Sequence, residues 1–253
     1  MSILMIMCLL FSVGSMSGWV LELFYRRIFS AKKWINPGFL VGPCVPLYGF
    51  GLSILFVLSY ILKFDQWFNF PNYLNIIIII LIMSIMMTLI EYIAGKIFIK
   101  GMGIKLWDYS NRWGNIDGII CPLFSLIWTG VSIGFYFLLR PVCANLVVWF
   151  EENAYINMWL PFMLGVFYGV LFVDLAYSLK ITKRIKEFAK ENHIVLRYEH
   201  FKQFIREQSQ KAKEKFSYLF PIKANLNIKD ALNKYVNKFK DMIENKDKNK
   251  KQK

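Results

Sequence analysis

A carboxylate inside an apolar run is the feature of this sequence best suited to chemistry. Glu91 lies near the end of a hydrophobic segment that begins around Leu74, and an ionisable group in such a segment is rare because its removal from water is costly. Carboxylates, a guanidinium group and aromatic rings at a membrane surface can bind a polar solute, transfer protons or hold a divalent metal. We therefore expect a polar site around the loop that follows. Its polar and aromatic residues are Trp107, Asp108, Tyr109, Asn111, Arg112, Trp113, Asn115 and Asp117.

Two further carboxylates are expected at the depth of Glu91. Glu22, Glu91 and Asp174 stand four, five and six residues before the first basic residue that follows each of them. At about 1.5 Å per helical residue they lie roughly 6 to 9 Å from the same membrane boundary, so they could share one cavity. The other candidates for this cavity are Arg26, Tyr48, Asp108, Arg112 and Asp117, with Trp107, Tyr109 and Trp113 as the aromatic loop residues.

A structural role for several of these residues is an open alternative. Glu22 and Arg26 are spaced i, i+4 in the order that favours an ion pair on one helix. Asp108 could cap backbone donors in its own turn, and the aromatic residues could mark the membrane interface. Glu91 has no opposite charge three or four residues further on, which favours a functional role for it. The four cysteines form no CxxC pair and no catalytic motif is recognisable, so we expect neither a metal nor a cofactor.

The composition is that of a membrane protein. Hydrophobic residues make up 56% and aromatic residues 17% of the 253 residues, and the mean hydropathy is +0.39. Several apolar runs are long enough to cross a bilayer as helices. These features exclude a soluble domain and predict an all-α integral membrane protein. Five transmembrane helices are expected, at about residues 3–25, 47–62, 74–97, 118–139 and 155–179, within a transmembrane domain of residues 1–181.

One connection between the expected spans is irregular. The segment from Asn36 to Gly51, NPGFLVGPCVPLYGFG, holds three prolines and four glycines while remaining apolar, so it cannot be a regular helix throughout. Irregular backbone at membrane depth needs polar partners from protein or water. We expect either a re-entrant, broken segment or a tight interfacial loop before the second span.

Charged residues set the expected orientation. The two loops assigned to the cytosolic side carry four Lys or Arg residues each, whereas the outside loops carry only Lys63 and Arg140. By the positive-inside rule, the N-terminus lies outside and the C-terminal tail lies in the cytoplasm, as in a multi-pass protein of the cell membrane. Residues 1–18 lack a basic region, so a cleaved signal peptide is not expected.

The tail, residues 182–253, is basic and keeps a helical periodicity. Residues from Lys180 onward contribute +12 of the net charge of +14. Behind a membrane domain, such a tail suits anionic lipid or a cytosolic partner better than nucleic acid. The last residues, DKNKKQK, are expected to be disordered. An amphipathic helix is predicted from apolar residues that recur every three or four positions: Ile228, Ala231, Leu232, Tyr235, Val236, Phe239, Met242 and Ile243.

Glycines four residues apart occur in three of the expected spans. Glycines at this spacing share one helix face and let a neighbouring backbone approach closely. Three such pairs favour a compact helical bundle, and homodimerisation is the competing use of one of these faces. The pairs are Gly14 with Gly18, Gly130 with Gly134, and Gly165 with Gly169.

Four strings of the sequence resemble one protein family in their order and spacing: GWVLELFYRR from Gly18, NPGFLVGPCVPLYGFG from Asn36, EYIAGKIF from Glu91 and LWDYSNRWGNIDGIICPLFSLIWTG from Leu106. Together they are similar to the ABC-transporter type IV permease family, also called CmpB-like, over about residues 18–130. Leu106 stands where that family has the first of two tryptophans, and Lys100 lies near the place of a second acid. The resemblance implies a transporter permease subunit and supplies no established catalytic residues.

The leading hypothesis is a permease-like membrane protein that handles a small solute or lipid-derived molecule in a polar cavity on the cytosolic side. The chain has no GxxxxGK[ST] phosphate loop, so any ATPase must be a separate polypeptide. Two alternatives stay open. One is a membrane-embedded enzyme acting on lipid headgroups, with Glu91, Asp108 or Asp174 as acid, base or metal ligand. The other is a non-catalytic scaffold whose basic tail recruits partners.

Overall fold

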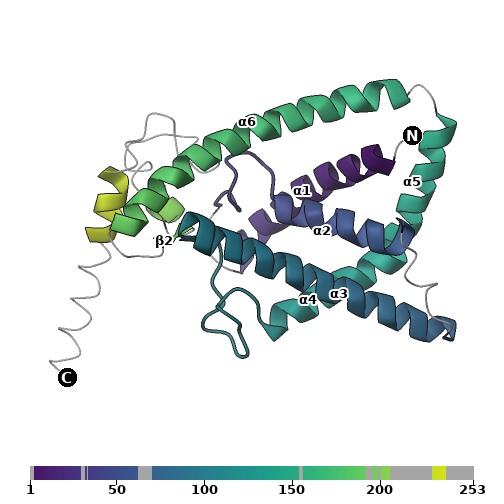
Figure 1. The fold of residues 1–253 in the computed structure, drawn as a ribbon, viewed down its shortest axis with the longest axis horizontal. Coiled ribbons are helices and arrows are strands. Elements are labelled where there is room, and N and C mark those ends of the chain that lie inside the picture. Colours follow the sequence, from purple (N-terminus) through teal and green to yellow (C-terminus); the bar gives the residue numbers. More distant parts are fainter. Residues whose placement is uncertain are drawn as a thin grey trace.

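The computed structural model describes residues 3–29, 32, 34–61, 70–153, 156–191, 196–198, 201–205 and 230–237, and these residues are mostly helical (Figure 1). Four helices are long and apolar enough to cross a membrane: Ile3–Ile28, Asn72–Gly101, Pro122–Trp149 and Met158–Phe188. They contain most of four of the five predicted spans. The chain therefore has the architecture of an all-α membrane protein.

The second predicted span, residues 47–62, forms a shorter element. Its helix α2 (Pro46–Phe56) has 11 residues and continues as a five-residue π-helical turn, Val57–Ile61. At about 1.5 Å per residue these 16 residues reach roughly 24 Å, less than the roughly 30 Å apolar core of a bilayer. The length of α2 alone therefore does not make it a full span.

The remaining elements follow in chain order with few interruptions. Pro46 and Pro122 stand in the first turns of α2 and α4, where the missing N–H leaves no helical bond unmade. The segment after residue 139, predicted as an outside loop, is instead a helix, because the apolar pattern continues beyond Pro141. The elements are α1 (Ile3–Ile28), α3 (Asn72–Lys96) with a π-helical turn (Ile97–Gly101), β1 (Ile104–Lys105), α4 (Pro122–Gly134) with a π-helical turn (Phe135–Leu139), α5 (Arg140–Glu152), α6 (Ile156–Glu191) and β2 (Leu196–Arg197).

Close packing of α1 on α2 organises the centre of the molecule. A Cβ added at Gly14 would lie 2.9 Å from the carbonyl oxygen of Tyr48, and one added at Gly49 would lie 2.6 Å from that of Phe11. Gly18 faces the Tyr48 ring directly. The first of the predicted glycine pairs is thus a helix contact, because only hydrogen fits between the two backbones.

The other two glycine pairs are not used in this way. Cβ atoms added at Gly130, Gly134, Gly165 and Gly169 would meet no atom within 4 Å in the part of the chain that the structure describes. The expectation that all three pairs build a compact bundle is therefore wrong for these two. Their faces on α4 and α6 remain open to lipid or to a second copy of the chain.

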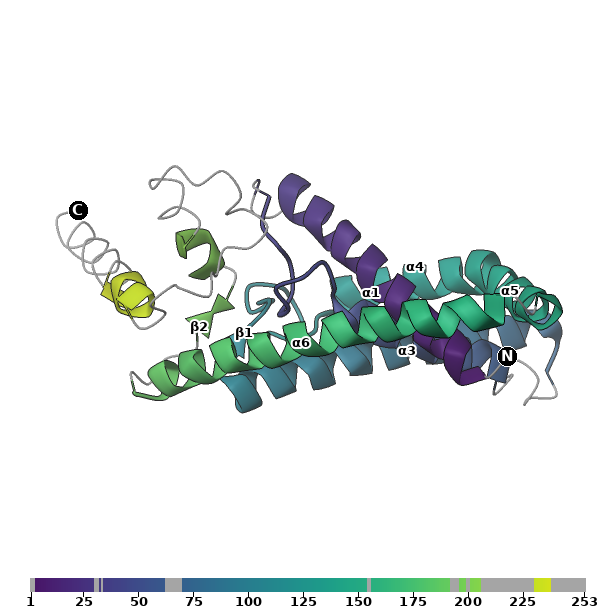
Figure 2. The ribbon, with the colours of Figure 1, turned by 90° about the horizontal axis from the view of Figure 1, so that it is seen from above.

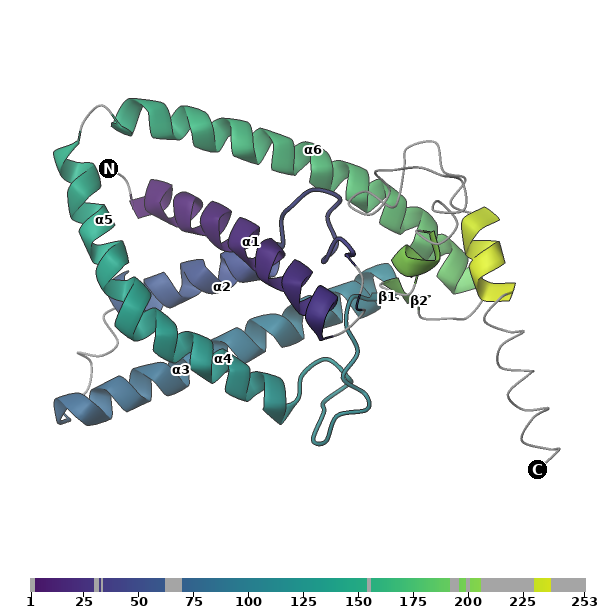
Figure 3. The ribbon, with the colours of Figure 1, turned by 180° about the vertical axis from the view of Figure 1, so that it is seen from behind.

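Helices α1 and α2 lie between α6 on one side of the molecule and α3 and α4 on the other. In Figures 1 and 3, α6 runs along one side, while α3 and α4 lie together on the other. One apolar core, which includes Phe56, Ile79, Met83 and Phe135, joins α2, α3 and the turn after α4. Figure 2 shows that α1 crosses the other helices at an angle, so that its C-terminal half rises out of their layer.

The irregular segment between α1 and α2 is held by a side chain from α6 and by one of its own. The carboxylate of Asp174, on α6, accepts hydrogen bonds from the backbone N–H groups of Val41 at 3.0 Å and Gly42 at 2.9 Å. The amide of Asn36, 3% exposed, donates to the carbonyl oxygen of Val41 at 2.6 Å. Protein groups thus supply the polar partners that irregular backbone at membrane depth requires.

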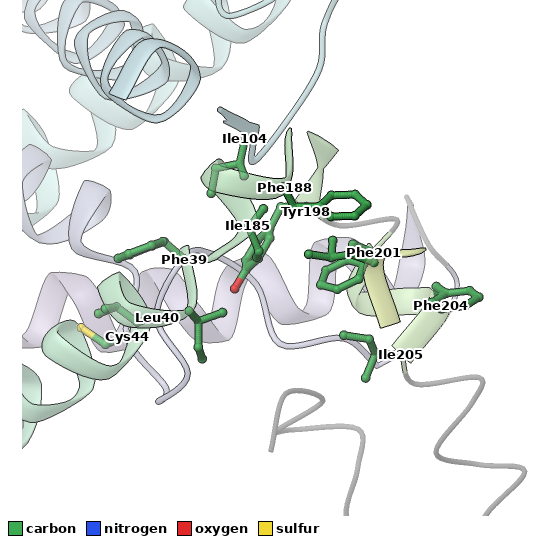
Figure 4. Packing of buried hydrophobic residues seen from close by; sticks show 12 residues of the cluster. Phe39, Leu40, Cys44, Ile104, Ile185, Phe188, Tyr198, Phe201, Phe204 and Ile205 are labelled. Carbon is green, nitrogen blue, oxygen red and sulfur yellow. The ribbon is translucent and has the colours of Figure 1, made fainter. Parts of the chain in front are cut away.

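A second apolar core lies where the tail returns to the helical domain (Figure 4). Residues 201–205 and 230–237 bring Phe201, Phe204 and Leu232 against Ile185 and Phe188 of α6. Strand β2 pairs in parallel with β1, with Ile104 opposite Leu196 and Lys105 opposite Arg197. The described part of the predicted amphipathic stripe, Ala231, Leu232, Tyr235 and Val236, therefore packs on the chain's own apolar core, whereas Ile228, Phe239, Met242, Ile243 and the last residues lie outside the described residues.

A buried lysine fastens the tail to the irregular segment. Lys202, 4% exposed, donates from Nζ to the carbonyl oxygens of Gly38 at 2.8 Å and Asn36 at 3.1 Å, and it lies 4.7 Å from the centre of the Tyr198 ring. We expect Lys202→Met to reduce stability by about 1–3 kcal/mol, because one buried and one partly buried carbonyl group lose their donor while the apolar stem is kept. Thermal unfolding in detergent measures the loss. Lys234→Met, at an exposed position of residues 230–237, is the matched control, and equal stability of the two variants would contradict this role.

Candidate functional site

A cavity of about 530 Å³ lies between the C-terminal half of α1, the start of α2, the end of α3, helix α4 and the loop before α4. These segments meet at one end of the helical domain (Figure 3). Of the residues proposed from the sequence, eight line it: Glu22, Arg26, Tyr48, Glu91, Trp107, Asp108, Tyr109 and Arg112. The volume suits a small organic molecule rather than a single ion.

Glu91 is the most buried charged group of this cavity, with 3% of its surface exposed. Its Oε1 accepts a hydrogen bond from the Tyr109 hydroxyl at 3.1 Å, and its Oε2 accepts one from Trp128 Nε1 at 2.8 Å. Both donors are uncharged side chains. The carboxylate is therefore held in one orientation without an opposite charge in contact with it in the described structure.

Glu22 also lines the cavity but is held differently. Its Oε1 accepts from the Tyr48 hydroxyl at 3.1 Å, and its Oε2 lies 3.4 Å from Arg26 Nε, one helical turn away. The ion pair suggested by the i, i+4 spacing is thus present, and its two partners also line the cavity. The Tyr48 ring lies 5.8 Å from the Trp128 ring, so aromatic residues connect the surroundings of Glu22 and Glu91.

The loop that closes the cavity is ordered by its own polar side chains. Asn115 donates from its amide to the carbonyl oxygens of Arg112 at 2.8 Å and Ser110 at 3.2 Å, and it accepts from the N–H of Gly118 at 3.0 Å. Trp107 Nε1 donates to the carbonyl oxygen of Ile119 at 2.8 Å. These bonds hold the loop in a compact turn, because they pair backbone groups that no helix or sheet satisfies.

The aromatic ring of Tyr109 forms part of the cavity wall. It stacks on Phe124, with ring centres 4.2 Å apart and planes 11° from parallel. Burial and the nearby Glu91 carboxylate raise the pKa of the Tyr109 hydroxyl above its ordinary value. The hydroxyl therefore stays protonated and able to donate to Glu91 at physiological pH.

Asp108 organises the start of this loop. It accepts hydrogen bonds from the Ser110 backbone N–H at 3.1 Å and from the Ser110 hydroxyl, and it pairs with Lys105 at 3.3 Å. Partial burial alone would raise its pKa, but these hydrogen bonds outweigh burial and lower the pKa of Asp108. The cap proposed as the structural alternative for Asp108 is thus present, although the residue also lines the cavity.

The lowered pKa predicts how the loop responds to acid. Because the folded-state pKa lies below the unfolded value of about 4, the carboxylate stabilises the fold above about pH 4 and loses this effect as the pH falls through the folded-state value. We therefore expect Asp108→Asn to lower the melting temperature by a constant amount from pH 8 to 5, and by a shrinking amount below about pH 4. Unfolding curves of both proteins in detergent at each pH measure the difference. A difference that grows towards acid would contradict this assignment.

Three residues proposed from the sequence lie outside the cavity. Asp174 holds the irregular segment, so it does not meet Glu22 and Glu91 as expected. Asp117 pairs with Lys96 at 2.6 Å on the exposed side of the loop, and Trp113 is 88% exposed. Asp174 was predicted at the same depth as Glu22 and Glu91, but it does not line the cavity. Its helix, α6, lies on the other side of the molecule from α3 and α4 (Figure 1).

Trp128, the closest hydrogen-bond donor to Glu91, was not singled out from the sequence. It lies within the apolar fourth span, where a Trp reads as a packing or interfacial residue. A signal was available, because a buried carboxylate needs donors and an indole N–H is one of the few that an apolar helix offers. Phe124 and Tyr25, which also line the cavity, carried no such signal.

Comparison with known proteins bears on the identity of the chain. No match was found among curated proteins or among solved structures. A family model described as "Putative ABC-transporter type IV", CmpB, matches residues 9–179. This match confirms the resemblance and extends it beyond residues 18–130, from α1 into α6. It covers every helix that forms the cavity and more than half of the sequence, so the chain belongs to the ABC-transporter type IV (CmpB) family.

Proposed function

We propose that this chain is the membrane-embedded permease component of an ABC-type transporter, and that it binds a small solute or lipid-derived molecule in the cavity around Glu91. The observation that carries the proposal is the cavity itself: three carboxylates, two guanidinium groups and several aromatic rings, from separate helices and from the loop before α4, line one space of about 530 Å³. Polar groups that converge in an otherwise apolar pocket are typical of a ligand site.

The proposed topology has five spans with the N-terminus outside and the tail in the cytoplasm of the cell membrane. Two features support it. The basic residues concentrate at the end of α1, at the end of α3 and in the tail, and this bias is characteristic of the cytosolic side. With α2 counted as a span, successive spans cross in opposite directions, since α1, α3 and α6 run one way and α2 and α4 the other (Figure 1). In this topology the cavity opens near the cytosolic boundary, and the basic tail lies beside anionic lipid headgroups.

The motor of such a transporter is a separate ATPase. The family assignment supports this, and the sequence contains no phosphate loop of its own. The ATPase would dock on the cytosolic side, where the proposed topology places the loop before α4 and the tail. Energy from ATP hydrolysis would then reach the cavity through the loop that carries Tyr109.

Purification of the full chain in mild detergent from its native membranes tests this proposal. We expect a polypeptide with a phosphate loop to copurify, and ATP hydrolysis by the complex to be sensitive to vanadate. Glu91→Gln should change the hydrolysis that substrate-containing membrane extract stimulates, whereas Glu152→Gln, an exposed carboxylate of α5, should leave it unchanged. A chain that purifies without any ATPase, or a complex whose hydrolysis is indifferent to Glu91, would overturn the proposal.

A further inference from the structure

We infer that the molecule bound in this cavity is an amphiphile with a positively charged head group, which reaches Glu91 from the bilayer between α1 and α4. This inference rests on the proposed function and narrows it to one class of ligand. Three observations carry it: the burial of Glu91 without a cationic partner in the described structure, the aromatic walls, and the apolar mouth of the cavity.

The burial of Glu91 without a cationic partner among the described residues is the first observation. Among the described residues, the other two carboxylates of the cavity have a cationic partner: Glu22 lies 3.4 Å from Arg26, and Asp108 lies 3.3 Å from Lys105. Glu91 is 3% exposed, and within the described part of the chain its hydrogen-bond donors are both neutral. Burying an unpaired carboxylate is unfavourable, and a cation in the adjacent space would offset the cost. The cavity thus has a place for one positive charge.

The aromatic walls are the second observation. Rings of Tyr48, Trp107, Tyr109, Phe124 and Trp128 line the same space as Glu91. The faces of aromatic rings attract cations, most strongly where water is excluded, and aromatic cages are a common way to bind alkylammonium groups. A carboxylate within such walls favours an ammonium head group over a carboxylate or phosphate.

The two arginines of the cavity do not reverse this preference. Arg26 is engaged with Glu22, so much of its positive charge is already matched. Arg112 belongs to the exposed part of the loop, where water weakens its field at Glu91. The buried part of the cavity is therefore the negative part.

The mouth of the cavity is the third observation. Helix α1 packs along α2, and α4 packs along α3, and both α1 and α4 contribute residues that line the cavity. Leu21 of α1 is 63% exposed, and Ile127 and Val131 of α4 are 50% and 41% exposed, yet all three also line the cavity. In a membrane these side chains face acyl chains. The opening therefore suits an alkyl chain, whereas the interior suits a cationic head.

Binding of a set of probes with one chain length and different head groups tests this inference. The full-length protein in maltoside detergent is titrated with dodecyltrimethylammonium, dodecanoate and dodecanol, and with tetramethylammonium, which has no chain. Tryptophan fluorescence reports binding, because Trp107 and Trp128 line the cavity. We expect dodecyltrimethylammonium to bind at least about tenfold more tightly than each of the other three probes. This selectivity should be kept in Glu152→Gln and lost in Glu91→Gln.

The possible outcomes separate the two proposals. Equal affinity for the three chain-bearing probes would overturn the cationic head group while leaving the cavity as a binding site. Equal affinity for tetramethylammonium and dodecyltrimethylammonium would overturn the route from the bilayer. Selectivity that survives Glu91→Gln would remove Glu91 as the partner of the cation.

Failure of all four probes to bind would overturn both this inference and the cavity of the proposed function. The comparison of probes on the unmodified protein decides the question of charge even if a variant does not fold.

Discussion

Glu91→Leu should make the protein less stable than Glu91→Gln by about 2–4 kcal/mol, because only leucine leaves the two donors around this position without a partner. Both substitutions remove the negative charge, so both relieve the cost of burying a charged carboxylate equally. Glutamine can keep both hydrogen bonds: its carbonyl oxygen accepts from Trp128 Nε1, now 2.8 Å from Oε2 of Glu91, and the Tyr109 hydroxyl can turn to accept from the new amide. Leucine can do neither.

Thermal or denaturant unfolding of the two variants in the same detergent measures this difference. The double variant Glu91→Leu with Trp128→Phe is the control, because it removes one unpartnered donor and should recover part of the loss. A leucine variant as stable as the glutamine variant would show that the donors find other partners. Glu91→Gln should therefore test the function of this position without unfolding the protein, since it removes the charge and keeps the packing.

Gly49→Ala should destabilise the protein by about 1–3 kcal/mol, because its added methyl group meets backbone that cannot move alone. The new Cβ would lie 2.6 Å from the carbonyl oxygen of Phe11 and would also collide with the Ser15 hydroxyl. Relief requires α1 and α2 to separate. The same shift would displace Tyr48, and with it the hydrogen bond to Glu22 at the cavity.

Gly165→Ala is the matched control for this prediction. Gly165 also lies within a helix, but a Cβ there meets no described atom within 4 Å. The substitution should leave stability unchanged or raise it by up to about 1 kcal/mol, because alanine favours the helix over glycine. Melting temperatures that fall equally for both variants would contradict the assignment of α1 and α2 as the tightly packed pair. A loss for Gly165→Ala alone would indicate instead that α6 binds a second copy through its glycine face.

The main features of the fold followed from local sequence patterns. Apolar runs of spanning length predicted the helices because a bilayer requires every backbone group to bond within its own segment. Proline and glycine between residues 36 and 51 predicted irregular backbone, and residues 34–45 are indeed non-helical. The outside loop predicted after residue 139 is a helix because the apolar pattern continues beyond Pro141. The compact use of all glycine pairs failed because it depended on which surfaces meet.

The candidate site was only partly accessible to sequence reasoning. Glu91 could be recognised from the sequence alone, because an acidic residue within an apolar helix is rare. Its partner Trp128 lies 37 positions later, and the two meet only because α4 folds back along α3. Asp174 looked equivalent to Glu91 by depth, yet it bonds to Val41 and Gly42, more than 130 positions away.

The sequence by itself determined the class of this protein, the approximate bounds of most of its helices, its family and the acidic residue at its centre. Each of these depends on composition or spacing within a single segment, because the apolar bilayer requires each segment to be apolar and to form its backbone hydrogen bonds internally. Only the tertiary structure decided which carboxylates share a cavity, which donors hold Glu91 and where the tail docks. Depth along a helix does not fix the direction in which a side chain points. Close contact at Gly14, Gly18 and Gly49 selects one arrangement of helices, and that arrangement determines the neighbours of every buried polar group.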